Sequence, residues 1–287
     1  MALALVTGSN SGIGLATAIA LARSGLTVAA TMRNLDRGAD IRKIADSENL
    51  PVHLFAVDVN DDASVRDGFD RVVAELGPID ALVNNAGVPG GGCAIEEGSL
   101  ETFRAVMETN FFGALRCIKA VVADMRERRS GTIVNVTSVA GRMASAPMSD
   151  YAASKWALEA LSECLAQEMR AFNVRVAIVE PGVIATPIFG KGGPRVENSV
   201  YPHARRISAL FAAALSNPTP PTVVGDLIRD IVVGESWQLR YPAGPDAAPM
   251  MKHRASLTDE EVIKRAAESD EAFVARVEQE MGIRLKL

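Results

Sequence analysis

The sequence predicts an α/β fold with a doubly wound parallel sheet, the Rossmann fold, in which helices cover both faces. Short β-branched runs alternate with longer segments of helical period. These runs are apolar throughout, which indicates strands that are buried on both faces. About 20 residues or more separate successive runs, enough for a crossover helix each time. We expect strands over residues 2–7, 27–32, 52–57, 81–84, 132–137 and 175–180.

A glycine-rich turn follows the first strand and opens the first helix, expected over residues 15–24. It reads TGSNSGIG over residues 7–14, a GxxxGxG spacing. Glycines let the backbone turn tightly and approach a pyrophosphate, while free N–H groups and the helix dipole favour an anion. A glycine cluster alone is more often an ordinary turn. Its place between strand and helix predicts dinucleotide binding.

The end of the second strand indicates which cofactor is bound. NAD-binding sheets usually place an acidic residue here, about 20 residues after the glycines, for the ribose hydroxyls. This chain has Arg33 followed by Asn34. Without a carboxylate at the strand end, a 2′-phosphate can pair with Arg33, so we expect NADP rather than NAD. In the alternative interpretation Arg33 is solvated and Asp36 reaches the ribose.

Tyr151 and Lys155 form the candidate catalytic pair. They lie four residues apart at the start of a helical pattern that runs to about residue 171, so one helix face carries both. An ammonium within about 4 to 6 Å lowers the pKa of a phenol by roughly 1 to 3 units, which would make Tyr151 a usable proton donor. A tyrosine and a lysine at this spacing usually lie on a helix surface by chance and have no catalytic role.

Residues at the ends of two strands support a catalytic role for Tyr151 and Lys155. Ser138 follows the fifth strand, and the turn NNAG over residues 84–87 closes the fourth. Sheets of this kind bind ligands beyond the carboxyl ends of their strands, so these residues are expected beside Tyr151. The Ser138 hydroxyl can hold a substrate oxygen, although a serine here more commonly satisfies backbone groups of a turn.

We expect one domain over residues 1–244 and a helical C-terminal extension over residues 245–287. Within the domain, glycines and prolines surround a helical stretch at about residues 200–215. This pattern is typical of an inserted lid, which we place at residues 187–221.

Further elements follow the lid. We expect a helix over residues 223–233 and an edge strand over residues 238–241, before the turn that begins at Pro242. Thr258 and Glu261 have the spacing of a capping box, which predicts a helix from about residue 259. A second helix is expected from about residue 270, with Gly282 as its stop.

Together these motifs resemble those of the short-chain dehydrogenase/reductase superfamily, over about residues 2–187. The matching pieces are the glycine turn, Asp58-Val59, Asn84 to Gly87, Asn110, Ser138, Tyr151 with Lys155, and Pro181-Gly182 followed by Thr186. The resemblance implies an NAD(P)-dependent oxidoreductase that acts on a small-molecule ketone, aldehyde or alcohol. It also implies a homodimer or homotetramer, joined through the helices after Phe103 and after Tyr151.

The resemblance implies roles for single residues. Asn110 would hold a water in a proton relay, and Ser138 would orient the carbonyl or alcohol. Tyr151 would exchange the proton, while Lys155 tunes Tyr151 and binds the nicotinamide ribose. The expected cofactor contacts, including those from the glycine turn and the second strand, are Gly8, Ser11, Gly12, Ile13, Gly14, Arg33, Asp58, Val59, Asn85, Ala86, Gly87, Tyr151, Lys155, Pro181, Gly182, Val183 and Thr186.

Apolar residues near the motifs suggest a lipophilic substrate. The candidate pocket walls are Val88, Met143, Met148, Val183, Ile188 and Phe189. Equally, these side chains could belong to the ordinary core.

Two other functions fit parts of the pattern. A nicotinamide-sensing binding protein would need the glycine turn but has no use for Ser138, Tyr151 and Lys155 together. A cofactor-free elimination or dehalogenation enzyme of a related family has a remodelled glycine turn and an Arg in place of Lys155. Both are disfavoured.

Composition excludes other classes. The 287 residues carry 30 basic and 35 acidic side chains, a net charge of −5 without basic clusters, so no nucleic-acid partner is expected. The three cysteines and three histidines have neither disulfide nor metal-ligand spacing, and we expect no metal site. No apolar stretch approaches the roughly 18 residues of a membrane span, and signal-peptide features are missing, so a cytoplasmic protein is expected.

Overall fold

The computed structural model describes residues 2–190, 199–281 and 284–287. These residues form a parallel sheet with strand order β3-β2-β1-β4-β5-β6-β7. The strands are β1 (Leu3–Thr7), β2 (Thr27–Met32), β3 (Val52–Ala56), β4 (Ala81–Asn84), β5 (Gly131–Val136), β6 (Val174–Pro181) and β7 (Arg240–Ala243). The prediction of a doubly wound α/β fold is confirmed.

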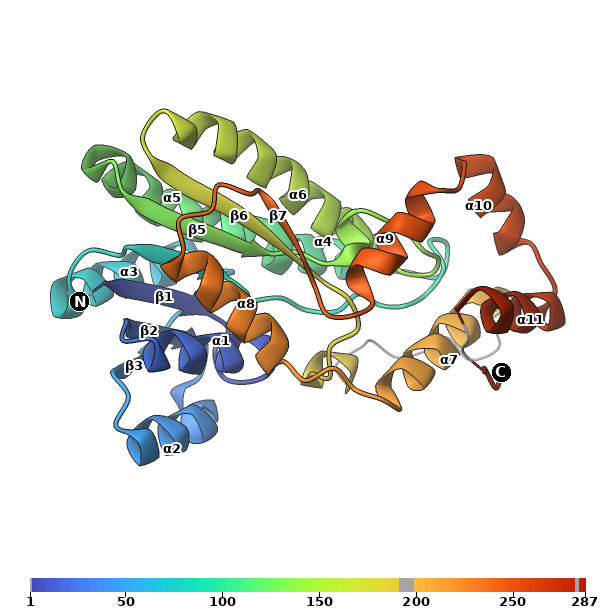
Figure 1. Ribbon diagram of the computed structural model, residues 1–287, viewed down its shortest axis with the longest axis horizontal. Coiled ribbons are helices and arrows are strands. Elements are labelled where there is room, and N and C mark those ends of the chain that lie inside the picture. The colour runs from blue at the N-terminus through green and yellow to red at the C-terminus, as the bar shows by residue number, and fades with distance from the viewer. Residues whose placement is uncertain (1, 191–198, 282–283) are drawn as a thin grey trace.

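Helices cover both faces of the sheet, and the last three lie toward the end of the molecule that carries the C-terminus (Figure 1). None of the helices in the described part of the chain combines the length and apolarity that crossing a membrane requires. The helices are α1 (Gly12–Arg23), α2 (Ala39–Glu48), α3 (Asp62–Leu76), α4 (Leu100–Met107), α5 (Gly113–Arg128), α6 (Ser149–Arg170), α7 (His203–Leu215), α8 (Thr222–Val233), α9 (Ala247–Ala255), α10 (Asp259–Ala266) and α11 (Asp270–Met281).

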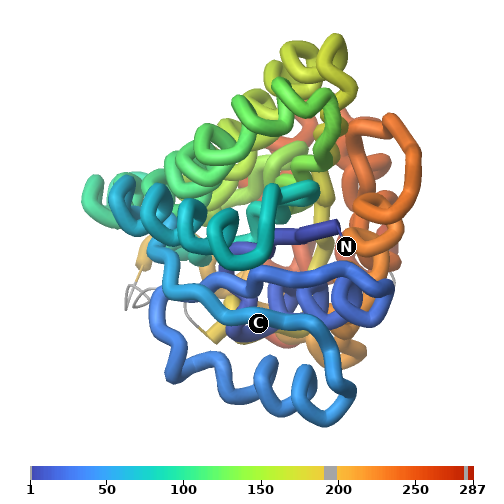
Figure 2. Tube along the Cα trace, turned by 90° about the vertical axis from the view of Figure 1, so that its left-hand side faces the viewer, coloured from blue at the N-terminus to red at the C-terminus, as the bar shows by residue number. Residues whose placement is uncertain are grey.

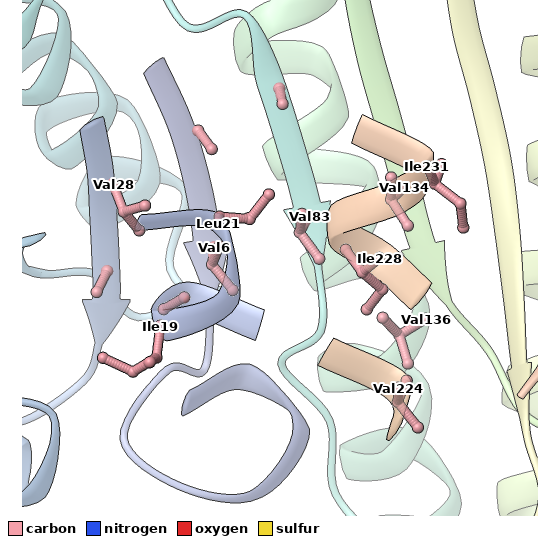
Figure 3. Close-up of a cluster of buried hydrophobic side chains, with 14 of the residues drawn as sticks. Val6, Ile19, Leu21, Val28, Val83, Val134, Val136, Val224, Ile228 and Ile231 are labelled. Carbon is pink, nitrogen blue, oxygen red and sulfur yellow. The ribbon is translucent and has the colours of Figure 1, made fainter. Parts of the chain in front are cut away.

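One face of the sheet packs against α1 and α8. Side chains from the neighbouring strands β2, β1, β4 and β5 form a buried cluster with Ile19 of α1 and Ile228 of α8 (Figure 3). The two helices approach closely because α8 carries Gly225 at their contact. A Cβ there would lie 2.8 Å from the backbone carbonyl carbon of Ala16.

The opposite face packs against α3, α5 and α6. Successive side chains of a strand point to opposite faces, so Leu5 and Leu82 join a second buried cluster with Ile118 of α5 and Leu165 of α6. Figure 2, turned by 90°, shows α3 and α5 on one side of the strands and α1 and α2 on the other. The apolar runs of the sequence therefore give two cores, one on each face.

The expected strands agree with the structure to within one residue at each end for the first six. The edge strand is the exception, because we expected residues 238–241 and a turn from Pro242. Instead β7 covers Arg240–Ala243 and includes that proline. The ladder tolerates Pro242 because an edge strand pairs on one side only, so the missing N–H can face away.

The C-terminal helices agree with their sequence signals where the chain is described. Helix α7, in the segment where we expect a lid, begins at residue 203, three residues later than expected. Thr258 and Glu261 form the expected capping box at the start of α10. Helix α9 had no specific prediction. Residues 191–198 of the lid and the expected stop at Gly282 lie outside the described residues.

Candidate active site

A cavity of about 730 Å³ lies at the carboxyl edge of the sheet. It includes the switch point between β1 and β4, whose following helices pack on opposite faces. All the site residues expected from the sequence line it, except Gly14 and Asn110. They are Gly8, Ser11, Gly12, Ile13, Arg33, Asp58, Val59, Asn85, Ala86, Gly87, Ser138, Tyr151, Lys155, Pro181, Gly182, Val183 and Thr186.

The glycine turn forms a cradle at the N-terminus of α1. Gly8 and Gly12 have φ of +68° and +57°, the left-handed region that favours glycine. No side chain caps α1 and its first turn has no acidic residue, so its N–H groups and dipole face the cavity. A Cβ on Gly8 would lie 2.9 Å from the Ala86 Cα. These features fit a diphosphate.

Gly14 has a different position from the one expected. A Cβ at this residue would lie 2.3 Å from the Gly8 carbonyl oxygen and 2.4 Å from Asn85 Nδ2. Gly14 therefore lets the helix pack closely behind the turn, and the structure does not place it on the cavity wall.

Thr7, the last residue of β1, joins the glycine turn to the end of β4. Its hydroxyl accepts hydrogen bonds from the backbone N–H groups of Asn85 and Ala86, both at 3.0 Å. The Asn85 side chain returns two bonds to the carbonyls of Thr7 and Gly8, at 2.9 and 3.2 Å. Sequence reasoning missed this role of Thr7, which is fixed by pairing between distant strands.

Two arginines that follow β2 contribute to the cavity wall. Arg33 lines it, as expected, and so does the exposed Arg37 from the turn that follows β2. Asp36, the alternative ribose ligand, is exposed and does not line the cavity. The two guanidinium groups therefore lie where an anionic group of a ligand could pair with them.

Helix α6 brings Tyr151 and Lys155 to the cavity wall, and the end of β5 brings Ser138. Lys155 is buried, and its Nζ donates a 3.0 Å hydrogen bond to the carbonyl of Val136. The same Nζ lies 5.7 Å from the centre of the Tyr151 ring. Ser138 accepts a 3.1 Å bond from the backbone N–H of Ala140, so it also has the turn role that we weighed as the alternative.

The electrostatics of the pair correct one expectation. Burial raises the pKa of Tyr151 above the usual phenol value, and a hydrogen bond with Ser138 opposes the rise. Burial lowers the pKa of Lys155 to about 8, while the Glu159 carboxylate opposes this shift. The expected lowering of the phenol pKa by the ammonium was wrong for the protein alone, because removal of water dominates at both groups.

Asn110 lies behind the cavity wall, in a π-helical turn (Glu108–Phe112) between α4 and α5. It is buried and bonds the backbone of Val88 in both directions, at 2.8 and 3.1 Å. Its amide also donates a 3.0 Å bond to the Ser154 hydroxyl of α6. Asn110 thus joins the segment after β4 to the helix of Tyr151.

Asp150 is a site residue that sequence reasoning missed. Its buried carboxylate accepts a 2.6 Å bond from the backbone N–H of Gly91 and a 2.7 Å bond from that of Tyr151. It lines the cavity and fixes the glycine-rich segment after β4 against α6. Its position beside Tyr151 was the available signal, but its partner lies 59 residues away.

The apolar part of the cavity has more wall residues than the six candidates. All six candidate wall residues line it, and α7 and α9 add further side chains that the sequence did not indicate. The added residues are Ala204, Ile207, Ser208, Phe211 and Met250.

Comparisons with known proteins agree with this geometry. Residues 2–196 match the family described as short chain dehydrogenase. The chain is 39% identical over 258 residues to a 3-ketodihydrosphingosine reductase of Bacteroides thetaiotaomicron, covering 81% of this chain and 91% of that protein. It is 35% identical over 251 residues to the uncharacterized oxidoreductase YusZ of Bacillus subtilis, covering 84% and 89% respectively.

A solved structure shows the same architecture over almost the whole chain. The short-chain dehydrogenase from Streptomyces avermitilis matches with a TM-score of 0.80 at 34% identity, covering 93% of this chain and 98% of that one. The chain therefore belongs to the short-chain dehydrogenase family of NAD(P)-dependent oxidoreductases.

Proposed function

We propose that the protein transfers a hydride between NADP(H) and the carbonyl or alcohol carbon of a small to medium lipophilic substrate. The observation that carries this proposal is the convergence of Ser138, Tyr151 and Lys155 on the cavity that contains the glycine turn. When bound, the nicotinamide supplies or accepts the hydride. The chain supplies alignment and a proton.

In the reducing direction, Tyr151 donates its phenolic proton to the carbonyl oxygen while the carbonyl carbon gains the hydride. The C=O group becomes CH–OH and the phenol becomes a phenolate. Ser138 donates a hydrogen bond to the same oxygen, and the Lys155 ammonium stabilises the phenolate. Solvent then returns a proton to Tyr151.

Asn110 is proposed to position a water in this proton path. Gly87 lies between it and Lys155: a Cβ on this glycine would be 3.2 Å from Asn110 Oδ1 and 3.8 Å from Lys155 Nζ. This proximity supports a relay that begins at Lys155 and passes the turn after β4.

The preference for NADP rests on Arg33, with Arg37 beside it on the cavity wall. Loss of one charge-assisted bond to a 2′-phosphate lowers affinity by about tenfold or more. We therefore expect Arg33→Ala to reduce kcat/KM with NADPH by about tenfold and to leave kcat/KM with NADH almost unchanged. Arg66→Ala, at an exposed arginine paired with Asp67 on α3, is the control. A wild-type preference for NADH would contradict the assignment.

The substrate class follows from the apolar walls. Met143, Met148, Ile188 and Phe189 line the same cavity as Tyr151, and the relative from Bacteroides is named for reduction of a ketone. A panel of ketones, aldehydes and lipophilic alcohols, followed by nicotinamide absorbance with each cofactor, tests the proposal. Turnover of lipophilic carbonyls supports it, and cofactor binding without any turnover would favour the sensing protein.

We also propose that the chain associates through α4, α5 and α6, as a homodimer or homotetramer. Leu100 and Trp156 are 66% and 49% exposed, and Phe112 next to α5 is 43% exposed. Large apolar side chains gathered on neighbouring helices are typical of a face that a partner covers.

A further inference from the structure

We propose that the C-terminal extension holds the substrate lid in place, with Arg206 as the main attachment, and thereby determines how tightly the enzyme binds extended substrates. Residues of α11 and of the turn before it contact the side of α7 that faces away from the cavity. Arg206 is thus a positioning residue for specificity. The inference rests on the proposed function for its kinetic part and on geometry alone for its structural part.

Helix α7 presents two different faces. Residues on one face line the cavity with i, i+3, i+4, i+7 spacing, namely Ala204, Ile207, Ser208 and Phe211. Residues on the other face have the same spacing, displaced by two positions, and contact the extension, namely Arg206, Ala209, Leu210 and Ala213. The helix is therefore a wall between the cavity and the extension, and a shift in its position changes the cavity.

Arg206 makes the polar part of the attachment. Only 5% of it is exposed, although it carries a full charge on the lid. Its guanidinium donates a 2.9 Å bond to the carboxylate of Asp270, the first residue of α11. It also donates bonds to the backbone carbonyls of Glu268, at 2.6 Å, and Ala266, at 3.4 Å. A buried arginine with three acceptors in one turn fixes both distance and orientation.

The apolar part of the attachment between α7 and the extension lies around Arg206. Phe273, Val277 and Leu285 form a small buried cluster with Leu210 and its neighbours on α7. The Arg206 guanidinium also lies 5.1 Å from the centre of the Phe273 ring. The cluster is separate from the two cores of the sheet. Figure 1 shows α7 and α11 together beyond the end of the sheet.

The catalytic groups do not share this support. Ser138 follows β5, and Tyr151 and Lys155 lie on α6, which packs against the sheet. Loss of the Arg206 contacts is therefore expected to alter the lid wall and to leave the catalytic groups in place. A substrate that reaches Phe211 will be affected, whereas a small carbonyl held at Tyr151 will not.

The test compares Arg206→Met and Arg206→Lys with wild type, using the full chain. For Arg206→Met we expect KM for a long-chain ketone to rise by about tenfold, with kcat for a short ketone and the dissociation constant of NADPH within roughly twofold of wild type. Arg206→Lys keeps the charge but loses the forked geometry of the guanidinium, so we expect a smaller rise in KM for the long-chain ketone. Arg284→Gln, which removes the ion pair of the 90% exposed Arg284 side chain with Glu278 in the same extension, is expected to change neither KM nor kcat.

Amide hydrogen exchange over residues 203–215 separates this inference from the proposed function. We expect Arg206→Met to speed exchange in α7 and to leave α6 unchanged. If Arg206→Met does not fold, Asp270→Asn replaces it, because it removes the carboxylate charge and keeps an acceptor oxygen. Unchanged exchange and unchanged KM in the folded variant would overturn the inference. A wild type that reduces no carbonyl would overturn the proposed function, and exchange in α7 would still decide the attachment.

Discussion

Lys155 is held at the active site by the backbone as well as by charge. Its Nζ bonds the carbonyl of Val136 at the end of β5, so sheet and helix together fix its position near Tyr151. Burial lowers the pKa of Lys155 to about 8, and Glu159 opposes this effect from one turn further along α6. A lysine with this pKa loses its charge just above neutral pH. The proposed stabilisation of a Tyr151 phenolate would then be lost.

This gives a pH dependence for the reductase reaction. We expect kcat/KM for carbonyl reduction to fall as the pH rises through about 8, because kcat/KM reports the pKa of groups in the free enzyme and the ammonium is the active form of Lys155. Initial rates at low substrate concentration between pH 6 and pH 10 measure it. A kcat/KM that stays constant up to the alkaline limit would contradict a role for the charged lysine.

At the level of elements, buried charges join α6 to the edge of the sheet. Arg240 of β7 bonds the Glu159 carboxylate at 3.1 Å and lies 3.5 Å from Glu180 at the end of β6. Burial raises the pKa of Glu180 to about 7, with Glu159 adding to the rise and Arg240 opposing it. Two buried carboxylates therefore share one guanidinium, which also pairs with the more exposed Glu163 of α6.

The sign of this shift predicts how stability depends on pH. The folded protein holds the Glu180 proton more tightly than the unfolded chain, so this contribution to the free energy of unfolding is complete below about pH 4.5 and is lost as the pH rises through 7. We expect Glu180→Gln to raise the free energy of unfolding by about 1 to 3 kcal/mol at pH 8. We also expect the free energy of unfolding to decrease less between pH 4.5 and pH 8 in this variant than in wild type. Urea unfolding across this range measures it.

Glu163→Gln provides the matched control for that experiment. Glu163 is a 46% exposed partner of the same Arg240, so its loss is expected to change the free energy of unfolding by less than about 1 kcal/mol. A Glu180→Gln variant that is less stable than wild type at pH 8 would show that the carboxylate contributes as an ion-pair partner.

The sequence predicted those elements whose signals are local. The apolar runs gave six strands to within a residue, and the glycine turn and the Thr258 capping box were both correct. The edge strand was predicted two residues too early, because Pro242 was expected to end it. A proline is tolerated in a strand that pairs on one side only, and the sequence alone does not show that β7 is such a strand. The roles of Asp150 and the cavity-facing side of α7 could not be found, because they arise from packing between segments far apart in the chain.

At the scale of the whole molecule, three parts meet at one cavity, and α7 is supported separately from the other two. The sheet and its two cores hold the glycine turn and Ser138, while α6 carries Tyr151 and Lys155. Helix α7 closes the apolar side and is held by the C-terminal extension. This division lets the substrate wall vary without disturbing the catalytic groups. It predicts that substitutions at α7 and α11 change substrate selection, while those on α6 change the rate.

The most direct measurement of the central claim is turnover by Tyr151→Phe beside its matched control. Tyr241→Phe removes a hydroxyl that bonds Ser236 outside the cavity and is expected to keep wild-type activity. Without the proton donor, we expect Tyr151→Phe to lose about 100-fold or more in kcat, with the dissociation constant of NADPH within roughly twofold of wild type. A Tyr151→Phe enzyme that turns over like wild type would contradict the account.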